Sequence, residues 1–305
     1  MSQQKQYSDR ELMEMLKVDA KMLARFQQIQ KETIAEAKKM SVRKNKKIKI
    51  LGISGTARDL NDMAQEKSNS ETLLEECLKN CEKLGAETEL VPLRKFSIMH
   101  CKACYSTCNT QCHFYCSCYP KGEPDGDDMS NKLYDKVLGA DAILFATPVN
   151  NFKISTLMAA FIDRCISLDG SLQPADPQTP KNKQLNAKHL EYIKLTADEN
   201  IPGSGFLRRF SGKVAGIIVT GHEEGASMAI SNLFMTLSHF GMLFPPFNNM
   251  YAMSSVCLST NQDKSVVLSD CYLHEVGLLA DNVVKAAYLA RTVSPFEWKV
   301  DPTSN

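Results

Sequence analysis

From residue 47 onward, short apolar runs rich in β-branched residues alternate with longer amphipathic segments of helical periodicity. The apolar runs occupy residues 48–54, 88–92, 142–147, 214–220 and, more weakly, 242–250. The helical segments occupy residues 69–84, 129–138, 155–168, 226–240 and 272–291. Strands that are buried on both faces read as continuous apolar runs, and parallel neighbours need a crossover that is usually a helix. The pattern therefore predicts an α/β fold with a doubly wound, five-stranded parallel sheet.

Four further parts of the chain lie outside this minimal plan. Residues 1–46 form an amphipathic helical extension that begins with Ser8 and Glu11 in capping-box spacing, and its apolar stripe must be covered by the main domain or by another subunit. Within the main domain, residues 47–292, we expect a cysteine-rich loop at 95–126 and an insert at 169–211. The insert is expected to be a lid or a subunit contact, with disorder as the alternative. Residues 293–305 form a C-terminal tail.

Charge and hydropathy exclude several classes of function. The chain has 36 basic and 35 acidic residues, so it gives no global reason to expect nucleic acid or an anionic membrane as a partner. Its first residues lack the apolar core of a signal peptide, and no stretch approaches the roughly 20 apolar residues of a membrane span. We therefore expect a cytoplasmic protein. A basic run at residues 38–49 is read as a solvated linker, with a docking patch for an acidic ferredoxin as the alternative.

Six of the eleven cysteines fall within residues 101–118. They are Cys101, Cys104, Cys108, Cys112, Cys116 and Cys118. In a reducing compartment such thiols are free to bind a metal, and an odd total opposes a framework made only of disulfides. The cluster therefore predicts metal or iron-sulfur ligation.

Ligands of doubly wound folds bind at the carboxyl ends of the strands, so the loops after the predicted strands are the places to look for a site. After the first strand, residues 52–58 are small, polar and basic, and residues 67–72 then open a helix with serine and threonine. Hydroxyls, Arg58 and a helix N-terminus can all donate to a phosphate, although the same residues also make an ordinary helix cap. The glycine spacing fits neither a Walker A loop nor a GxGxxG fingerprint.

Two later loops complete the edge of the predicted sheet. Residues 146–152 follow the third strand and offer backbone polar groups and an aromatic side chain, which suits a flat conjugated ring better than a metal. Residues 220–226 follow the fourth strand and contain glycines that permit the backbone to approach a ligand closely. His222 and Glu223 are the titratable groups there that we consider for proton delivery, with solvent-facing loop residues as the plainer interpretation; the catalytic residue is otherwise unknown.

Together these loops resemble those of the NADPH-dependent FMN reductases among flavodoxin-like proteins, and in particular of the iron-sulfur flavoproteins. The family has a Gly-Ser-Pro-Arg type turn with Asn-Thr at the helix start, a Thr-Pro-Val-Tyr loop before a Lys-Ala-Phe-Ile-Asp-Arg helix, and a Thr-Gly run after strand four. The similarity covers about residues 47–250 and implies that FMN is bound by these residues: Ser54, Thr56, Arg58, Ser68, Asn69, Ser70, Thr147, Pro148, Val149, Asn150, Asn151, Phe152, Thr220, Gly221, His222 and Gly225.

The chain departs from the family's pattern at two places. An insert around residues 59–65 separates the halves of the phosphate loop. Asn150 stands where the family usually has an aromatic residue near the flavin, so we expect Phe152 to take over stacking.

The resemblance also implies a 4Fe-4S cluster beside FMN, because thiolates are soft, charged donors that suit iron. The expected ligands are Cys101, Cys104, Cys108 and Cys116. Three alternatives stay open. Zinc could use Cys101 and Cys104 with Cys116 and Cys118, with His113 as a further ligand; the thiols could form reversible disulfides; or they could have no cofactor role.

The function that these expectations describe is an FMN-dependent oxidoreductase that couples two-electron flavin chemistry to one-electron transfer through the cluster. NAD(P)H is the expected electron donor, ferredoxin or a similar protein the expected partner, and a homodimer or homotetramer the expected assembly. Two rival functions are a plain NAD(P)H-dependent flavin or quinone reductase, and a non-enzymatic flavodoxin-type carrier.

Overall fold

In the computed structural model, the described residues are 7–42, 47–63, 65–106, 111–123, 127–222, 225–254 and 260–298. The main domain is built on a parallel sheet with the strand order β2-β1-β3-β5-β6. Its strands are β1 (Lys49–Ser54), β2 (Glu87–Pro92), β3 (Ala142–Asn150), β5 (Val214–Gly221) and β6 (Asn249–Met253). The order changes direction between β1 and β3, so the carboxyl ends of these strands flank the topological switch point. The predicted α/β doubly wound fold is confirmed, and the order 2-1-3-4-5 of its parallel strands is the flavodoxin-like order.

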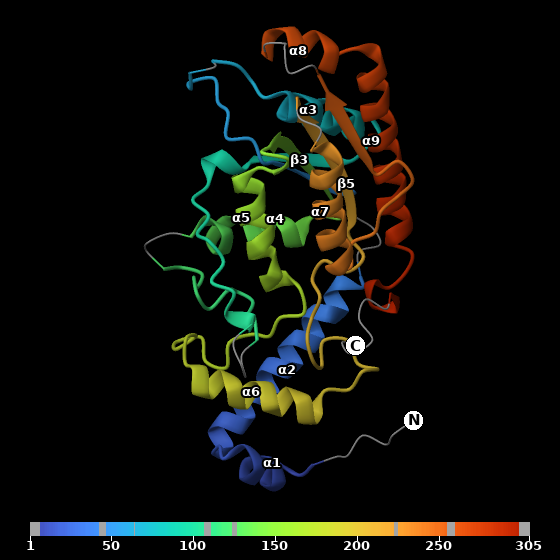
Figure 1. The fold of residues 1–305 in the computed structure, drawn as a ribbon. Helices are drawn as coiled ribbons and strands as arrows, with labels where there is room; N and C mark the ends of the chain where they lie inside the picture. Colours follow the sequence, from blue (N-terminus) through green and yellow to red (C-terminus); the bar gives the residue numbers. More distant parts are fainter. Residues whose placement is uncertain are drawn as a thin grey trace.

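Helices cover both faces of the sheet (Figure 1). On one face lie α3 (Asn69–Lys83) and α9 (Asp270–Ala290), whose apolar side chains pack with Ile50, Leu144 and Ile218. On the other lie α4 (Tyr134–Gly139), α5 (Thr156–Cys165) and α7 (Ala226–His239), which pack with Ile53 and Phe145. Alternate residues of the inner strands β1, β3 and β5 thus serve two separate cores, which is why these three strands are largely apolar.

The N-terminal helices and the 169–211 insert form a third core of their own. Helices α1 (Asp9–Leu16) and α2 (Ala20–Met40) pack with α6 (Lys183–Thr196) at one end of the molecule (Figure 1). Phe26 of α2 lies fully buried with its ring 4.9 Å from that of His189 and 5.7 Å from that of Tyr192. The insert therefore covers the apolar stripe of the extension. None of its residues lines the cavity described below.

Several elements differ from the expected ones. The last strand begins at Asn249 and not at residue 242, because Pro245 and Pro246 precede it and a proline cannot donate to a strand ladder. A two-residue strand, β4 (Lys153–Ile154), pairs antiparallel with the end of β3. Helix α8 (Thr260–Val267) was not anticipated. Residues 129–133 form a π-helical turn ahead of α4.

No helix in the described part of the chain combines the length and the apolar character that crossing a membrane requires.

Candidate functional site

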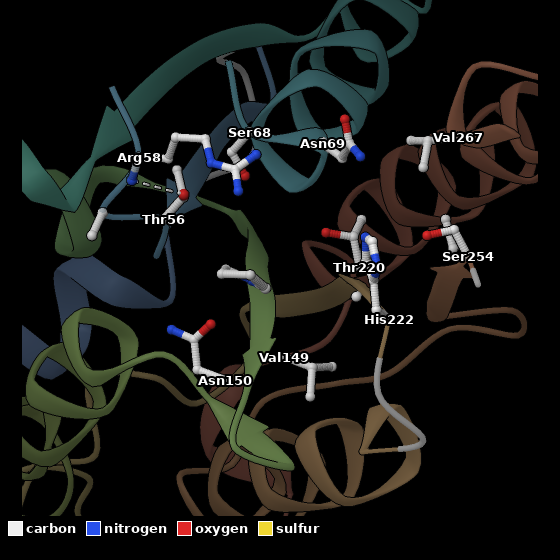
Figure 2. Close-up of a pocket in the computed structure, with 14 residues that line it drawn as sticks. Thr56, Arg58, Ser68, Asn69, Val149, Asn150, Thr220, His222, Ser254 and Val267 are labelled. Atoms are coloured by element: carbon white, nitrogen blue, oxygen red, sulfur yellow. Dashed lines mark hydrogen bonds between the residues drawn. The ribbon is translucent and has the colours of Figure 1, made fainter. Parts of the chain in front are cut away.

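A cavity of about 360 Å³ lies at the carboxyl edge of the sheet (Figure 2). Its volume is within the range of pockets that hold small molecules and cofactors. Its walls come from the ends of β1, β3, β5 and β6, the start of α3 and the end of α8. The lining residues are Thr56, Ala57, Arg58, Ser68, Asn69, Pro148, Val149, Asn150, Thr220, Gly221, His222, Ala252, Ser254 and Val267.

The end of the cavity formed by β1 and α3 is built to receive an anion. Ser68 is the N-cap residue of α3 but makes no side-chain cap hydrogen bond, and its Oγ lies 3.0 Å from Ser70 Oγ. The first N–H groups of the helix are therefore not satisfied by the usual cap. The backbone N–H of Arg58 donates to Thr56 Oγ1 over 3.2 Å, and the Arg58 side chain extends toward Ser68 (Figure 2).

Asn69 supplies a polar atom that lacks a partner. Its Oδ1 is buried and has no hydrogen-bond partner within the part of the chain that the structure describes. A buried polar atom without a partner is costly, so the amide is suited to meet a polar group of a ligand. Among the described residues that line the cavity, none is acidic, while Arg58 and His222 are basic. The donor set thus fits a ligand with a phosphate at one end and hydroxyl groups beside it.

The first and second loops are held together by Ser155, the N-cap residue of α5. Its Oγ donates to the carbonyl of Gly55 over 2.6 Å and accepts the N–H of Met158 over 3.2 Å. Its own N–H donates to Thr147 Oγ1 over 3.1 Å. One buried serine thus fixes the spacing between the phosphate-type loop and the loop after β3.

The second and third loops are in direct contact at two glycines. A Cβ at Gly225 would lie 2.5 Å from Phe152 Cα, and one at Gly221 would lie 2.9 Å from Val149 Cβ. Asn151 and Phe152 adopt positive φ values of 50° and 62°, which turn the chain sharply between β3 and β4. These glycines were expected to allow close approach to a ligand. Here the space beside them is filled by the neighbouring loop, and Gly225 does not line the cavity.

The structure brings most of the predicted FMN-binding residues to this cavity, but not all. The predicted residues that line it are Thr56, Arg58, Ser68, Asn69, Pro148, Val149, Asn150, Thr220, Gly221 and His222. The others lie behind or beside it: Ser54, Ser70, Thr147, Asn151, Phe152 and Gly225. Ser54 and Thr147 are fully buried, so they act as supports for the loops.

Phe152 is 54% exposed and lines a different cavity, so the structure does not place it for the stacking expected from the sequence. The positive φ values of residues 151 and 152 turn it away from the first cavity. Conversely, Ala252, Ser254 and Val267 line the first cavity without having been predicted. The sequence pattern placed the last strand too early, and α8 was missed, so their position at the site could not be inferred. Glu223 lies outside the described residues.

The second cavity, of about 1090 Å³, is a largely apolar groove between the cysteine loop, α5 and α7. Cys101, Tyr105 and Phe152 line one side, and Met228 and Met235 line the other. Cys101, a predicted cluster ligand, thus faces this groove, and its sulfur accepts the N–H of Ala103 over 3.4 Å.

Four other thiols of the cysteine loop interact with one another. A hydrogen bond with Cys112, partial burial and the nearby Cys116 raise the pKa of Cys104 to about 11, although a hydrogen bond with Cys118 acts to lower it. A hydrogen bond with Cys118, together with burial, raises the pKa of Cys116. Of the predicted ligands, Cys104 and Cys116 are therefore in this group and Cys101 is not, while Cys108 lies outside the described residues.

Arg164 connects this thiol group to helix α5. Its guanidinium makes a bidentate ion pair with Asp127, at 2.8 and 2.6 Å, and donates to the carbonyl of Met99 over 3.0 Å. It lies 4.6 Å from the centre of the Tyr119 ring. Its positive charge acts against the rise in the pKa of Cys116. A buried cation of this kind favours thiolates beside it.

No set of three or more His, Cys, Asp or Glu side chains in the described ranges is arranged to hold a single metal ion. His113, the additional zinc ligand considered above, is buried and its Nδ1 lies 2.7 Å from Ser117 Oγ. Burial lowers its pKa to about 4. Cys104, Cys112, Cys116 and Cys118 are soft sulfur donors, and thiolates are the donors that iron-sulfur clusters use.

Comparisons with known proteins bear on both parts of the site. A family model described as NADPH-dependent FMN reductase matches residues 48–254. An iron-sulfur flavoprotein of Archaeoglobus fulgidus is 28% identical over 117 residues, which cover 38% of this chain and 48% of that protein. The chain thus spans about half the length of this relative.

Among solved structures, RosB with bound 8-demethyl-8-formylriboflavin-5'-phosphate superposes with a TM-score of 0.54 at 17% identity, covering 81% of each chain. A flavone reductase gives a TM-score of 0.44 at 19% identity, covering 79% of this chain and 63% of the other. The likeness to RosB shows a shared fold.

Proposed function

The chain belongs to the NADPH-dependent FMN reductase family. We propose that it is a flavin-dependent oxidoreductase that couples the two-electron chemistry of FMN to one-electron transfer through a 4Fe-4S cluster in its cysteine loop. The observation that carries this proposal is the pairing of an anion-receiving cavity at the sheet edge with a group of four thiols anchored to helix α5.

FMN, when bound, supplies a ring that accepts a hydride or two single electrons. In the proposed arrangement its phosphate is held at the start of α3 by Thr56, Arg58 and Ser68, because those groups offer donors and positive charge. Asn69 contributes its amide to the polar chain of the cofactor. Val149 and Asn150, at the end of β3, and Thr220 and His222, at the end of β5, border the remainder of the cavity.

An FMN titration of the apoprotein, followed by quenching of flavin fluorescence, tests this placement. We expect T56A and N69A each to weaken FMN binding by about 5- to 10-fold, the loss of one hydrogen bond to a charged or buried group. The matched control is S265A, a substitution of a serine outside the cavity lining, which should leave the Kd unchanged. Unchanged affinity in both T56A and N69A would place FMN elsewhere.

For the cluster, we propose Cys104, Cys112, Cys116 and Cys118 as ligands, which revises the set expected from the sequence. The name of the archaeal relative supports iron as the metal. The buried ion pair between Arg164 and Asp127 holds the loop against α5, and the guanidinium offsets the negative charge that thiolates would concentrate there.

Serine substitution of each cysteine in the loop, with anaerobic purification and measurement of iron, sulfide, zinc and FMN, tests the ligand set. C104S, C112S, C116S and C118S should each lose most of the iron, while C101S should retain it. C271S is the control, because Cys271 is exposed on α9 away from the loop. Zinc without iron in the wild-type protein would contradict the cluster and leave a flavin reductase with a structural metal.

NADPH as the donor and ferredoxin as a one-electron partner are part of the same proposal. Turnover of NADPH with an artificial acceptor distinguishes a reductase from a carrier, because a carrier would show none.

We also propose a homodimer or homotetramer. Exposed apolar side chains on α7 support it, since Met228 is 61% exposed and Met235 is 70% exposed. Sedimentation should show more than one chain per particle, and substitution of both residues by lysine should shift the particles toward the monomer.

A further inference from the structure

We infer that Arg94 is a positioning residue for the phosphate of FMN, which acts by neutralising Glu71 beneath the phosphate-binding end of the cavity and by fixing the residue next to Arg58. The inference rests on the proposed placement of FMN. It concerns the part of the chain, the insert around residues 59–65, in which this sequence departs from the pattern of its family.

Glu71 occupies an unusual position for a buried carboxylate. It lies in the first turn of α3, only 3% exposed, three residues after the N-cap Ser68. A glutamate at this position normally turns back to the N-cap residue in a capping box. Here it does not: Glu71 accepts the hydroxyl of Ser54 over 2.6 Å and both terminal nitrogens of Arg94 over 2.5 and 3.0 Å.

The diversion of Glu71 has two consequences for the start of α3. The cap is left without side-chain hydrogen bonds, so the positive end of the helix faces the cavity. A carboxylate nevertheless lies within a turn of that end, where an unpaired negative charge would repel a phosphate. Burial acts to raise the pKa of Glu71, but the hydrogen bonds from Arg94 and Ser54 outweigh it and hold the carboxyl ionised. Arg94 thus keeps this charge paired.

The same guanidinium also holds the insert. Arg94 Nε donates to Asp59 Oδ2 over 3.0 Å, and this bond is the main reason that the pKa of Asp59 lies below its ordinary value. The N–H of Asp59 in turn donates to Asp62 Oδ2 over 2.8 Å. Because Asp59 follows Arg58 directly, the anchored insert sets the position from which Arg58 reaches the cavity.

The test compares two ligands that share a ring and differ in the phosphate: FMN and riboflavin. The wild-type apoprotein should bind FMN at least about tenfold more tightly than riboflavin, because charge-assisted hydrogen bonds to phosphate are strong. In R94M we expect this ratio to fall about tenfold or more while riboflavin affinity changes little. Adding E71Q to R94M should restore the ratio to within about threefold, because the repelling charge is gone.

R291M is the matched control. Arg291 also pairs with a largely buried aspartate, Asp141, at 2.7 Å, but at the opposite edge of the strands, and its loss should leave the ratio unchanged. D59N, which removes only the negative charge from the exposed half of the network, should lower the ratio about threefold. D59N also tests the role of the Arg94 network if R94M does not fold.

Three results separate the possible failures. If wild-type protein binds FMN and riboflavin equally, the proposed phosphate site itself is wrong. If wild-type protein discriminates but R94M and D59N do so equally well, Arg94 has no role in positioning. If R94M loses both ligands alike and E71Q does not restore FMN, Arg94 serves only the stability of the loop.

Discussion

Replacing Arg164 by methionine should destabilise the cysteine loop more than any other single change to its anchor. The side chains of Arg164 and Asp127 are only 1% and 4% exposed, so removing the guanidinium strands a carboxylate in the interior. The substitution deletes a bidentate ion pair and a hydrogen bond to the Met99 carbonyl. Breaking a buried pair of this kind costs about 3–5 kcal/mol. At roughly 2 °C per kcal/mol for a chain of this size, the Tm should fall by about 6–10 °C.

The loss of stability caused by R164M should depend on pH in a defined direction. Burial acts to raise the pKa of Asp127, but the hydrogen bonds and charge of Arg164, with backbone N–H groups, hold it below the ordinary value. A carboxyl whose folded pKa is depressed stabilises the fold above its unfolded pKa, and this contribution is lost as pH falls through the folded value. The difference in unfolding free energy between wild type and R164M should therefore be largest near neutral pH and shrink below about pH 4.

Urea unfolding at pH 7 and near pH 3.5, with hydrogen exchange of residues 95–106, provides the assay. The double variant R164M/D127N should recover about half of the lost stability, because the stranded charge is removed while the amide oxygen still accepts one of the two N–H groups, that of Met99 or that of Ser130. A loss below about 1 kcal/mol at pH 7, or no recovery in the double variant, would refute the reasoning.

Three other predictions test separate parts of the site and fold. G225A should weaken FMN binding at least about tenfold, measured by fluorescence titration, because its Cβ would lie 2.5 Å from Phe152 Cα and must displace the second loop; unchanged affinity would show that the loops yield freely. F152A should leave the Kd for FMN within about twofold of wild type, because Phe152 lines the second cavity, and a larger loss would return it to a stacking role. F26A should lower the unfolding free energy by about 3–5 kcal/mol in urea melts, because this ring is fully buried between α2 and α6, whereas L289A on the exposed face of α9 should change it little.

The sequence predicted the strands of this fold correctly where their apolar pattern was unambiguous. Strands β1, β3 and β5 are buried on both faces, so their apolar runs stand out, and the predicted bounds of β1, β2 and β5 agree with the structure to within a residue. The last strand was placed early because Met242–Phe247 is apolar without forming a strand, and two prolines intervene before Asn249. The two-residue β4 is too short to leave a periodic signal.

The sequence predicted correctly which residues line the cavity where a loop directly follows a buried strand. It did not do so where contacts with distant parts of the chain decide the direction of a side chain. The residues from the first three loops reached the cavity because parallel strands bring their carboxyl ends to one edge. Phe152 did not reach the cavity, because its direction depends on the positive φ values of Asn151 and Phe152 in the turn after β3. The thiol group depends on how a loop of little regular structure folds back on itself, so spacing alone favoured Cys101, which faces the groove instead.

The most direct measurement of the central proposal is a reductive titration of the anaerobically purified protein, with absorbance recorded after each addition of dithionite. A chain that carries both FMN and one cluster should take up about three electrons, two at the flavin and one at the cluster. The C104S variant should take up about two, with the same flavin content. Two electrons per chain in the wild-type protein, with flavin fully reduced, would show that FMN is the only redox centre and would contradict the coupling of two-electron to one-electron chemistry proposed for this protein.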